Sequence, residues 1–175
     1  PNMEGLELCS TVSTKEPYTV GKADAEFNVA TLDLGIKRSI LRNLLRVGCR
    51  VTVYPYNTPF AVLSADEPDG YFLSNGPGDP AASSEVIDTV REILASNKPT
   101  FGICLGHQMI ALASGLSTYK MHNGHRGINH VTVESTIRLR ILERARERLL
   151  HKTTDLPSPL RMWLRTQESS LPTCI

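Results

Sequence analysis

Apolar residues along the chain alternate between short runs that suit buried strands and longer stretches at helical spacing. The short runs are bounded by Gly, Pro or Asp, which is typical of strands that end in turns. In the longer stretches apolar residues recur every three or four positions, which predicts amphipathic helices. The predicted strands span 27–34, 49–54, 71–73 and 100–103, and the predicted helices span 37–47, 60–65, 83–95 and 105–114. This alternation predicts an α/β fold with a doubly wound, mostly parallel sheet flanked by helices.

The N-terminal part of the chain lacks this pattern. Residues 1–26 are polar and mixed, so we expect a linker or the end of a preceding N-terminal domain. Residues 27–130 carry the predicted domain. Within it, Ser83 or Ser84 is placed to cap the helix that follows.

The C-terminal part differs in composition. Residues 131–175 contain none of the twelve glycines and carry eight Lys or Arg against five acids, a net charge of +3. Residues 1–130 carry eleven against thirteen, a net charge of −2. We expect a helix over 137–150 and poor order in the Pro-containing residues that follow it. The whole tail is expected to be foreign to the fold, as a shifted reading frame would produce.

The composition indicates the number of domains and the kinds of partner and location to expect. The chain of 175 residues has room for one domain with its own core, and its 41% hydrophobic content and net charge of +1 are ordinary for a globular protein. We therefore expect neither nucleic acid nor membrane as a partner. The four cysteines show no paired spacing, so we expect no disulfide framework, no metal site and a reducing, cytoplasmic location. The chain starts at Pro1 rather than Met, which agrees with a fragment or a processed chain.

The strand-to-helix junction at Cys104 is the strongest chemical signal. A strand that turns sharply into a helix holds the residue at the turn in a cramped backbone geometry, with its side chain above the sheet edge. Only small neighbours fit there, and Gly102 and Gly106 lie two residues before and after Cys104. The helix N-terminus favours a thiolate. Cys104 is thus predicted to be a nucleophile, although a lone cysteine on an apolar strand is more often buried and inert.

An acyl-transfer nucleophile needs two donors for the oxyanion that develops on the attacked carbonyl. Leu105, directly after the nucleophile, offers one backbone N–H. The loop with Gly76 and Gly78 follows a neighbouring strand and can offer the second, because a backbone without Cβ approaches a substrate closely. The alternative for this loop is a tight turn without chemistry.

Gln108 lies one helical turn after Cys104, where its amide can bind a polar substrate or simply face solvent. His107 is also close in sequence, but the helix carries it away from the sulfur, so we expect a packing or surface role. The histidines among 122–130 match no zinc spacing, and we interpret them as part of a polar loop.

Four stretches together resemble the class I (triad-type) glutamine amidotransferases, and more narrowly the amidotransferase domain of the small subunit of carbamoyl phosphate synthetases. They are FGICLGHQ at 101–108, LSNGPGDP at 73–80, HRGINH at 125–130 and LDLGIKR at 32–38. The segment at 13–18 resembles the linker that precedes this domain in the family. The resemblance covers about residues 3–130, and the tail at 131–175 does not match.

The resemblance implies a function and residue roles. Cys104 would attack the side-chain amide of glutamine, releasing ammonia and leaving a thioester that water hydrolyses. Gly76, Gly78, Leu105 and Gln108 would bind glutamine, with Gly78 and Leu105 forming the oxyanion hole. The partner would be a large synthetase subunit that uses ATP and Mg²⁺ to make carbamoyl phosphate for arginine and pyrimidine synthesis. No cofactor is expected in this chain itself.

The chain also departs from the family. The family base is a His followed two residues later by an orienting Glu, in a His-Pro-Glu motif, and this sequence contains none. The family motif Gln-Asn-His-Gly-Phe is absent as well. Two interpretations therefore stay open: a glutaminase that is weak or inactive as a single chain, or a non-catalytic fragment that retains glutamine or large-subunit binding. A redox role for Cys104 is a third interpretation, but it does not explain the LSNGPGDP loop. His151 is the only tail histidine that could replace the base, and nothing around it resembles an orienting carboxylate.

Overall fold

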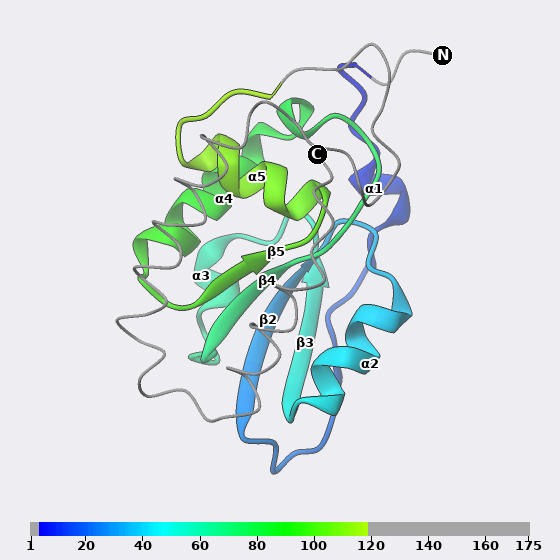
Figure 1. The fold of residues 1–175 in the computed structure, drawn as a ribbon, viewed down its shortest axis with the longest axis vertical. Helices are drawn as coiled ribbons and strands as arrows, with labels where there is room; N and C mark the ends of the chain where they lie inside the picture. The colour runs from blue at the N-terminus through cyan, green and yellow to red at the C-terminus, as the bar shows by residue number, and fades with distance from the viewer. Residues whose placement is uncertain (1–3, 119–175) are drawn as a thin grey trace, which may run out of the picture. The chain divides into compact units, whose positions relative to one another are not determined.

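A five-stranded sheet forms the centre of the computed structural model, which describes residues 4–118 (Figure 1). The strands lie in the order β1-β3-β2-β4-β5. They are β1 (Tyr18–Val20), β2 (Phe27–Asp33), β3 (Cys49–Pro55), β4 (Gly70–Leu73) and β5 (Thr100–Gly102). All of the described helices and strands belong to Pro1–Lys120, the first of two compact units in the chain. The predicted helix over 137–150, the HRGINH stretch and His151 lie outside the described residues.

Strand pairing places the chemical loops at one edge. Strands β3, β2, β4 and β5 are mutually parallel, with Leu32 opposite Leu73 and Leu73 opposite Gly102. The carboxyl ends of β2, β4 and β5 therefore meet at the same edge of the sheet. The chain reverses its direction of travel across the sheet between β2 and β4, and α/β proteins bind ligands at such a switch point.

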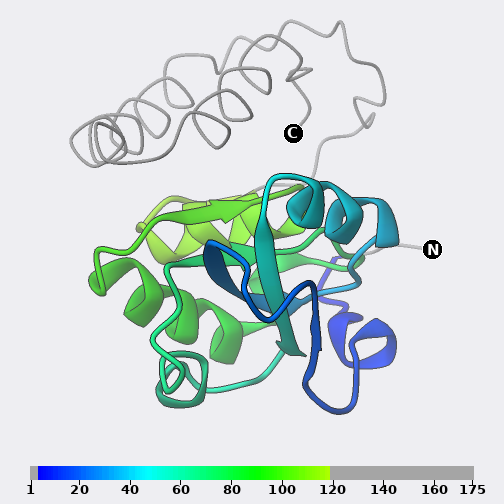
Figure 2. The same cartoon turned by 90° about the horizontal axis from the view of Figure 1, so that it is seen from below.

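The structure confirms a doubly wound α/β fold, with helices on both faces of the sheet (Figure 2). Helix α2 packs on β3 on one side, whereas α3 and α4 lie on the other side, where α5 packs against α4, β4 and β5. The helices are α1 (Cys9–Val12), α2 (Arg38–Arg46), α3 (Phe60–Leu63), α4 (Ser84–Ala95) and α5 (Leu105–Ala113), with a 3₁₀ turn η1 (Pro80–Ala82). None of the described helices is long and apolar enough to cross a bilayer.

The core between the sheet and the α3–α5 layer follows the sequence pattern. Alternate residues of β2 and β4 point into it, as expected for strands with a period of two. They meet the apolar face of α4 and the start of α5. The buried members include Ala30, Leu32, Tyr71, Leu73, Leu63, Val86, Val90, Ile93, Leu105 and Met109. This packing fixes the position of α5, and with it the residue that precedes α5.

Residues 1–26 contain structure that the sequence did not predict. The segment expected to be a linker includes α1 and β1, and β1 pairs antiparallel with β3 through Tyr18, Thr19 and Val20. Its three-residue length is too short for periodicity to indicate a strand, so only the pairing with β3 defines it. The parallel sheet therefore carries an antiparallel edge strand.

The capping prediction at the start of α4 is wrong. Ser83 occupies the N-cap position, but its side chain makes no cap hydrogen bond. The Ser83 hydroxyl is buried, with 3% of the residue exposed, and has no hydrogen-bond partner in the part of the chain that the structure describes. Its backbone torsions, φ −114° and ψ 65°, are not those of the extended N-cap geometry that directs the hydroxyl to the helix N–H groups.

We expect Ser83→Ala to leave the free energy of unfolding unchanged or to raise it, because the substitution removes a buried hydroxyl without breaking a hydrogen bond. Ser74→Ala is the matched control. The buried Ser74 hydroxyl accepts from Leu34 N–H at 2.8 Å and donates to the Asn75 carbonyl at 2.8 Å, so its loss should cost about 1–3 kcal/mol. Urea denaturation of both variants measures the difference, and a destabilised Ser83→Ala protein would contradict the assignment.

Candidate functional site

Cys104 occupies a strained turn between β5 and α5. Its torsions are φ 53° and ψ −112°, a positive φ outside the left-handed helical region. A non-glycine residue in such a conformation costs of order 1–3 kcal/mol and persists only where its surroundings enforce it. The residue is exposed. The structure therefore has the sharp strand-to-helix turn that the sequence predicted, with an accessible sulfur at its apex.

The two glycines around Cys104 are required by close packing. A Cβ on Gly106 would lie 2.3 Å from the Leu73 carbonyl O, and a Cβ on Gly102 would lie 2.6 Å from the carbonyl C of Gly106. Both distances are shorter than real Cβ contacts. Because neither glycine has a positive φ, their role is to provide space rather than an unusual backbone conformation.

Hydrogen bonds attach the turn to the neighbouring strand. Ile103 N–H donates to the Leu73 carbonyl at 3.1 Å, and Gly106 N–H donates to the Ser74 carbonyl at 3.1 Å. The loop after β4 thus begins beside the start of α5. These bonds explain how the Cys104 backbone is held in its strained conformation.

The structure brings Gly76 and Leu105 together. A Cβ on Gly76 would lie 2.0 Å from the Leu34 carbonyl O and 2.9 Å from Leu105 Cδ2, so the loop after β4 passes between the end of β2 and the first residue of α5. Gly78 follows two residues later with φ +103°, a conformation that favours glycine. The expected glutamine-binding glycines therefore lie on the loop that adjoins the cysteine turn.

Leu105 and Gln108 stand in the first turn of α5. Leu105 N–H has no acceptor among the described residues, as expected for the first residue of a helix. Gln108 N–H donates to the Cys104 carbonyl at 3.1 Å, one turn along. The half-buried Gln108 side chain has no hydrogen-bond partner in residues 4–118. His107 lies between them and is half-buried.

Three polar residues that the sequence did not single out shape this edge. The Asp33 carboxylate accepts from Gly35 N–H at 2.9 Å, Ile36 N–H at 2.8 Å and Thr14 N–H at 2.8 Å. The Asn75 side chain joins the same turn to the loop after β4, because its amide donates to the Gly35 carbonyl at 3.0 Å. Ser74 completes the network through its hydroxyl. Their sequence signals were their position at strand ends and their place within the LDLGIKR and LSNGPGDP stretches.

The other described cysteines differ from Cys104 in environment. Cys9 and Cys49 are buried, whereas Cys104 is exposed. Burial raises the pKa of the Cys9 thiol to about 11, with the nearby Glu7 carboxylate adding to the effect. Burial likewise raises the pKa of the Cys49 thiol to about 11, with Asp69 contributing. Both remain neutral thiols near pH 7, and burial keeps them from reagents.

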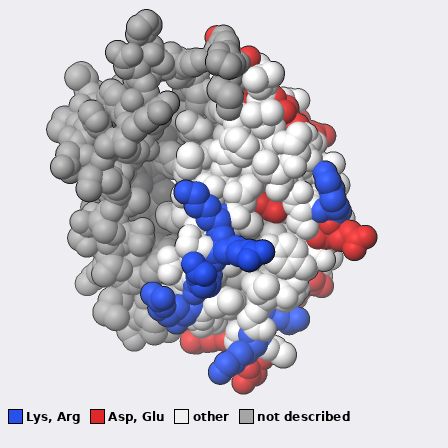
Figure 3. Space-filling model, turned by 90° about the vertical axis from the view of Figure 1, so that its right-hand side faces the viewer, with Lys and Arg blue, Asp and Glu red and all other residues white. Residues whose placement is uncertain are grey.

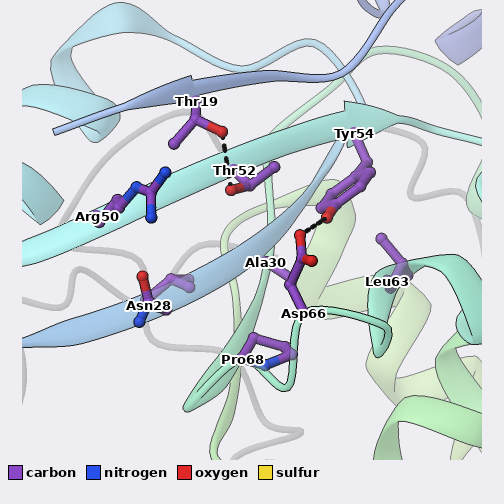
Figure 4. Close-up of a pocket in the computed structure, with 10 residues that line it drawn as sticks. Thr19, Asn28, Ala30, Arg50, Thr52, Tyr54, Leu63, Asp66 and Pro68 are labelled. Carbon is purple, nitrogen blue, oxygen red and sulfur yellow. Dashed lines mark hydrogen bonds between the residues drawn. The ribbon is translucent and has the colours of Figure 1, made fainter. Parts of the chain in front are cut away.

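Two other surface features lie outside the proposed site. A cavity of about 310 Å³ lies over the amino half of β2 and along β3, and its lining includes Thr52, Tyr54 and Asp66 (Figure 4). Tyr54 donates to Asp66 there at 3.4 Å, and no site residue named above lines the cavity. On α2, Arg38, Arg42 and Arg46 form an exposed stripe on the face shown in Figure 3, which fits a solvated helix surface. Among residues 4–118, no group of three or more His, Cys, Asp or Glu is arranged to hold a metal ion.

We expect Gly106→Ala to destabilise the protein by about 3 kcal/mol, because the new methyl meets the β4 backbone and neither element can move without disturbing the core. Gly115→Ala is the control. Gly115 has φ +85° and open space around its Cα, so alanine there costs only the backbone strain, about 1–2 kcal/mol. Thermal and urea unfolding compare the two. Equal losses would show that packing against Leu73 does not restrict residue 106.

We expect iodoacetamide near pH 7.5 to alkylate Cys104 much faster than Cys9 or Cys49. Their raised pKa means that they react only as the pH approaches about 11, and then chiefly on unfolding. The two thiols also make stability depend on pH. They lose their protons near pH 9 in the unfolded chain but only near pH 11 in the folded protein, so the free energy of unfolding should fall between about pH 9 and 11. Peptide mass spectrometry after timed labelling measures each site. Equal rates at the three cysteines would contradict this assignment.

The chain is similar in sequence to a known family and to curated proteins. Residues 30–172 match the family Glutamine amidotransferase class-I. The carbamoyl phosphate synthase small chain of Rubrivivax gelatinosus is 51% identical over 142 residues, covering 74% of this chain and 37% of the relative. The small chain of Chlorobaculum tepidum is 52% identical over 132 residues, covering 74% and 36%. This chain therefore spans little more than a third of the length of these curated relatives.

The fold is also similar to a solved structure. A Thermoplasma acidophilum protein described as a GMP synthase subunit superposes with a TM-score of 0.50 at 27% identity, covering 58% of this chain and 51% of the other. The family match extends past residue 130 into the tail that we expected not to match, and the domain boundary at residue 130 stays a prediction. The fold, the strained cysteine turn and the match over residues 30–172 agree, and the chain belongs to the class I glutamine amidotransferase family.

Proposed function

We propose that this chain provides the nucleophile and oxyanion loop of a glutaminase site that serves a carbamoyl phosphate synthetase. The observation that carries the proposal is Cys104: an exposed thiol on a strained turn at a helix N-terminus, beside a glycine loop. This arrangement suits acyl transfer because the sulfur is accessible and backbone N–H groups face the same edge of the sheet. The names of the similar small chains support glutamine as the substrate.

The proposed reaction proceeds in two steps. The Cys104 sulfur attacks the carbonyl carbon of the glutamine side-chain amide, forming an S–C bond while the carbonyl oxygen becomes an oxyanion. The C–N bond then breaks, the departing nitrogen takes a proton, and ammonia leaves a glutamyl thioester. Water attacks the thioester, the S–C bond breaks, and glutamate and the free thiol result. No cofactor takes part in either step.

The residues around Cys104 have distinct roles in this proposal. Leu105 N–H and Gly78 N–H donate to the oxyanion, for which Leu105 N–H is free of other described acceptors. Gly76 and Gly78 allow the loop backbone to approach the substrate. Gln108, half-buried one turn from the nucleophile, binds a polar end of glutamine. Removal of a single oxyanion donor costs about 10²–10³ in turnover in other hydrolases.

The proposed partner is the large subunit of the synthetase. Ammonia released at Cys104 would pass to it, and it would use ATP and Mg²⁺ to make carbamoyl phosphate. The support is that the similar relatives are named as small chains of carbamoyl phosphate synthase. With this partner, we propose that the chain acts in the cytoplasm, in arginine and pyrimidine synthesis.

A non-catalytic role is the second candidate, and the sequence itself favours it in one respect. The His-Pro-Glu motif that supplies the family base does not occur in this chain. Loss of the base in a triad hydrolase lowers turnover on the order of a million-fold, which leaves only oxyanion-hole and binding effects. A cysteine needs its base less than a serine does, but the leaving nitrogen must still be protonated. We therefore propose weak activity for the chain alone.

Ammonia release from glutamine tests the proposal, with the purified chain alone and with the large chain of a carbamoyl phosphate synthetase. We expect slow release by the wild-type chain, an increase on adding the large chain, and none from Cys104→Ala. Cys49→Ala, which alters a buried cysteine in β3, is the matched control and should retain release. Release that survives Cys104→Ala would overturn the nucleophile assignment. If the folded wild-type chain releases no ammonia but still binds glutamine in calorimetry, the non-catalytic role is established.

A further inference from the structure

The segment before the sheet packs against the loop that carries Gly78. Figure 1 shows α1 and the residues before it alongside the connection from β4 to η1, at the carboxyl edge of the sheet. Three contacts join them: Asp79 N–H donates to the Leu6 carbonyl at 2.9 Å, Gly5 N–H donates to Asp79 Oδ2 at 2.8 Å, and the Cys9 thiol lies 3.9 Å from the Pro77 carbonyl O. Residues more than sixty positions apart thus hold one loop.

Two of these contacts fall on the two peptide units that flank Gly78, and the third holds the Asp79 side chain. The Pro77 carbonyl and the Gly78 N–H belong to one planar unit and point in opposite directions, because the peptide is trans. A thiol that holds the Pro77 carbonyl toward Cys9 therefore directs Gly78 N–H away from Cys9. The bond from Asp79 N–H to Leu6 holds the next unit in the same way.

Gly78 needs this support more than another residue would. Its φ is +103°, and glycine adopts positive and negative φ with similar ease, so its own conformational preference does not select one peptide orientation. A Cβ at this position would lie 2.8 Å from the Leu6 carbonyl, which shows how closely the segment approaches. The loop orientation is therefore set by contacts from outside the loop.

The holding segment is itself anchored to the sheet. Thr14 N–H donates to Asp33 Oδ2 at 2.8 Å, and Tyr56 N–H donates to Ser13 Oγ at 2.9 Å. Cys9 is 1% exposed, and burial, with the nearby Glu7 carboxylate adding to the effect, raises the pKa of its thiol to about 11, so the thiol keeps its proton at neutral pH. The segment is thus tied to the ends of both β2 and β3.

We propose that residues 5–9 act as a positioning clamp, which holds the two peptides around Gly78 so that Gly78 N–H faces the oxyanion formed at Cys104. The clamp rests on the proposed function, since it acts through the oxyanion hole assigned there. Asp79 and Cys9 are positioning residues rather than catalytic ones. Without the clamp, a rotated Pro77–Gly78 peptide would present a carbonyl oxygen to the oxyanion and repel it.

Two alkylating probes separate the clamp from the nucleophile. A chloromethyl ketone analogue of glutamine, with –CO–CH₂Cl in place of the amide, alkylates Cys104 as the S–C bond forms and chloride leaves. Its ketone oxygen occupies the oxyanion site and gains negative charge during attack. Iodoacetamide forms the same kind of bond, with loss of iodide, but does not depend on that site. The ratio of the two rates at Cys104 therefore reports the oxyanion hole alone.

Asp79→Ala is the first clamp variant, and Asp69→Ala is its matched control. Asp69 makes the same reciprocal pair with a backbone segment, accepting from Asn28 N–H at 2.7 Å and donating to the Asn28 carbonyl at 2.8 Å, at the opposite edge of the sheet. We expect Asp79→Ala to lower the limiting rate with the chloroketone about tenfold, without changing its half-saturating concentration or the iodoacetamide rate. Asp69→Ala should leave both rates at the wild-type values.

Cys9→Ala, with Cys49→Ala as control, tests the second contact in the same assay and should also lower only the chloroketone rate. The clamp proposal is wrong if the Asp79 and Cys9 variants react more slowly with both reagents. It is also wrong if these variants react with both reagents at the wild-type rates. If the folded wild-type chain reacts with iodoacetamide at Cys104 but not with the chloroketone, the proposed glutaminase function fails first and the clamp fails with it. Circular dichroism of each variant confirms that the fold is present.

Discussion

The contact between the backbone of α5 and the end of β4 is the constraint on which the candidate site depends. Gly106 lies so close to the Leu73 carbonyl that no side chain fits between them, and Gly106 N–H is bonded to Ser74. This contact forces the chain to turn within the two residues between β5 and α5, which places Cys104 in a positive-φ conformation. The strain at Cys104 is thus balanced by packing that involves the buried face of α5, including Met109.

Environment rather than residue type distinguishes the nucleophile. Three cysteines lie in the described part of the chain, and two of them are buried thiols with raised pKa values. In the clamp that we propose, one of these, Cys9, supports the site, because a protonated thiol can donate weakly to the carbonyl of Pro77. In our two proposals, the same kind of side chain acts as an exposed nucleophile at Cys104 and as a positioning donor at Cys9.

The site is assembled from segments that are distant in sequence. The turn after β2, the loop after β4 and the turn after β5 converge at one edge because their strands are parallel neighbours. Asp33 joins the turn after β2 to a fourth segment, since its carboxylate accepts from Gly35 N–H in its own turn and from Thr14 N–H before β1. Membership of the class I amidotransferases agrees with this architecture, and the relatives are more than twice as long as this chain. Among residues 4–118, the loop that carries Gly78 is contacted by Gly5, Leu6 and Cys9.

The sequence by itself determined the main helices and strands, the α/β fold and the turn at Cys104. Those features depend on local periodicity and on glycines close to the cysteine, so neighbouring residues are sufficient to predict them. Only the tertiary structure decided the position of β1, the orphaned Ser83 hydroxyl and the docking of residues 5–9 on the loop after β4. The physical reason is that these features depend on hydrogen bonds and packing between residues far apart in the chain, such as Gly5 with Asp79, which no local pattern encodes.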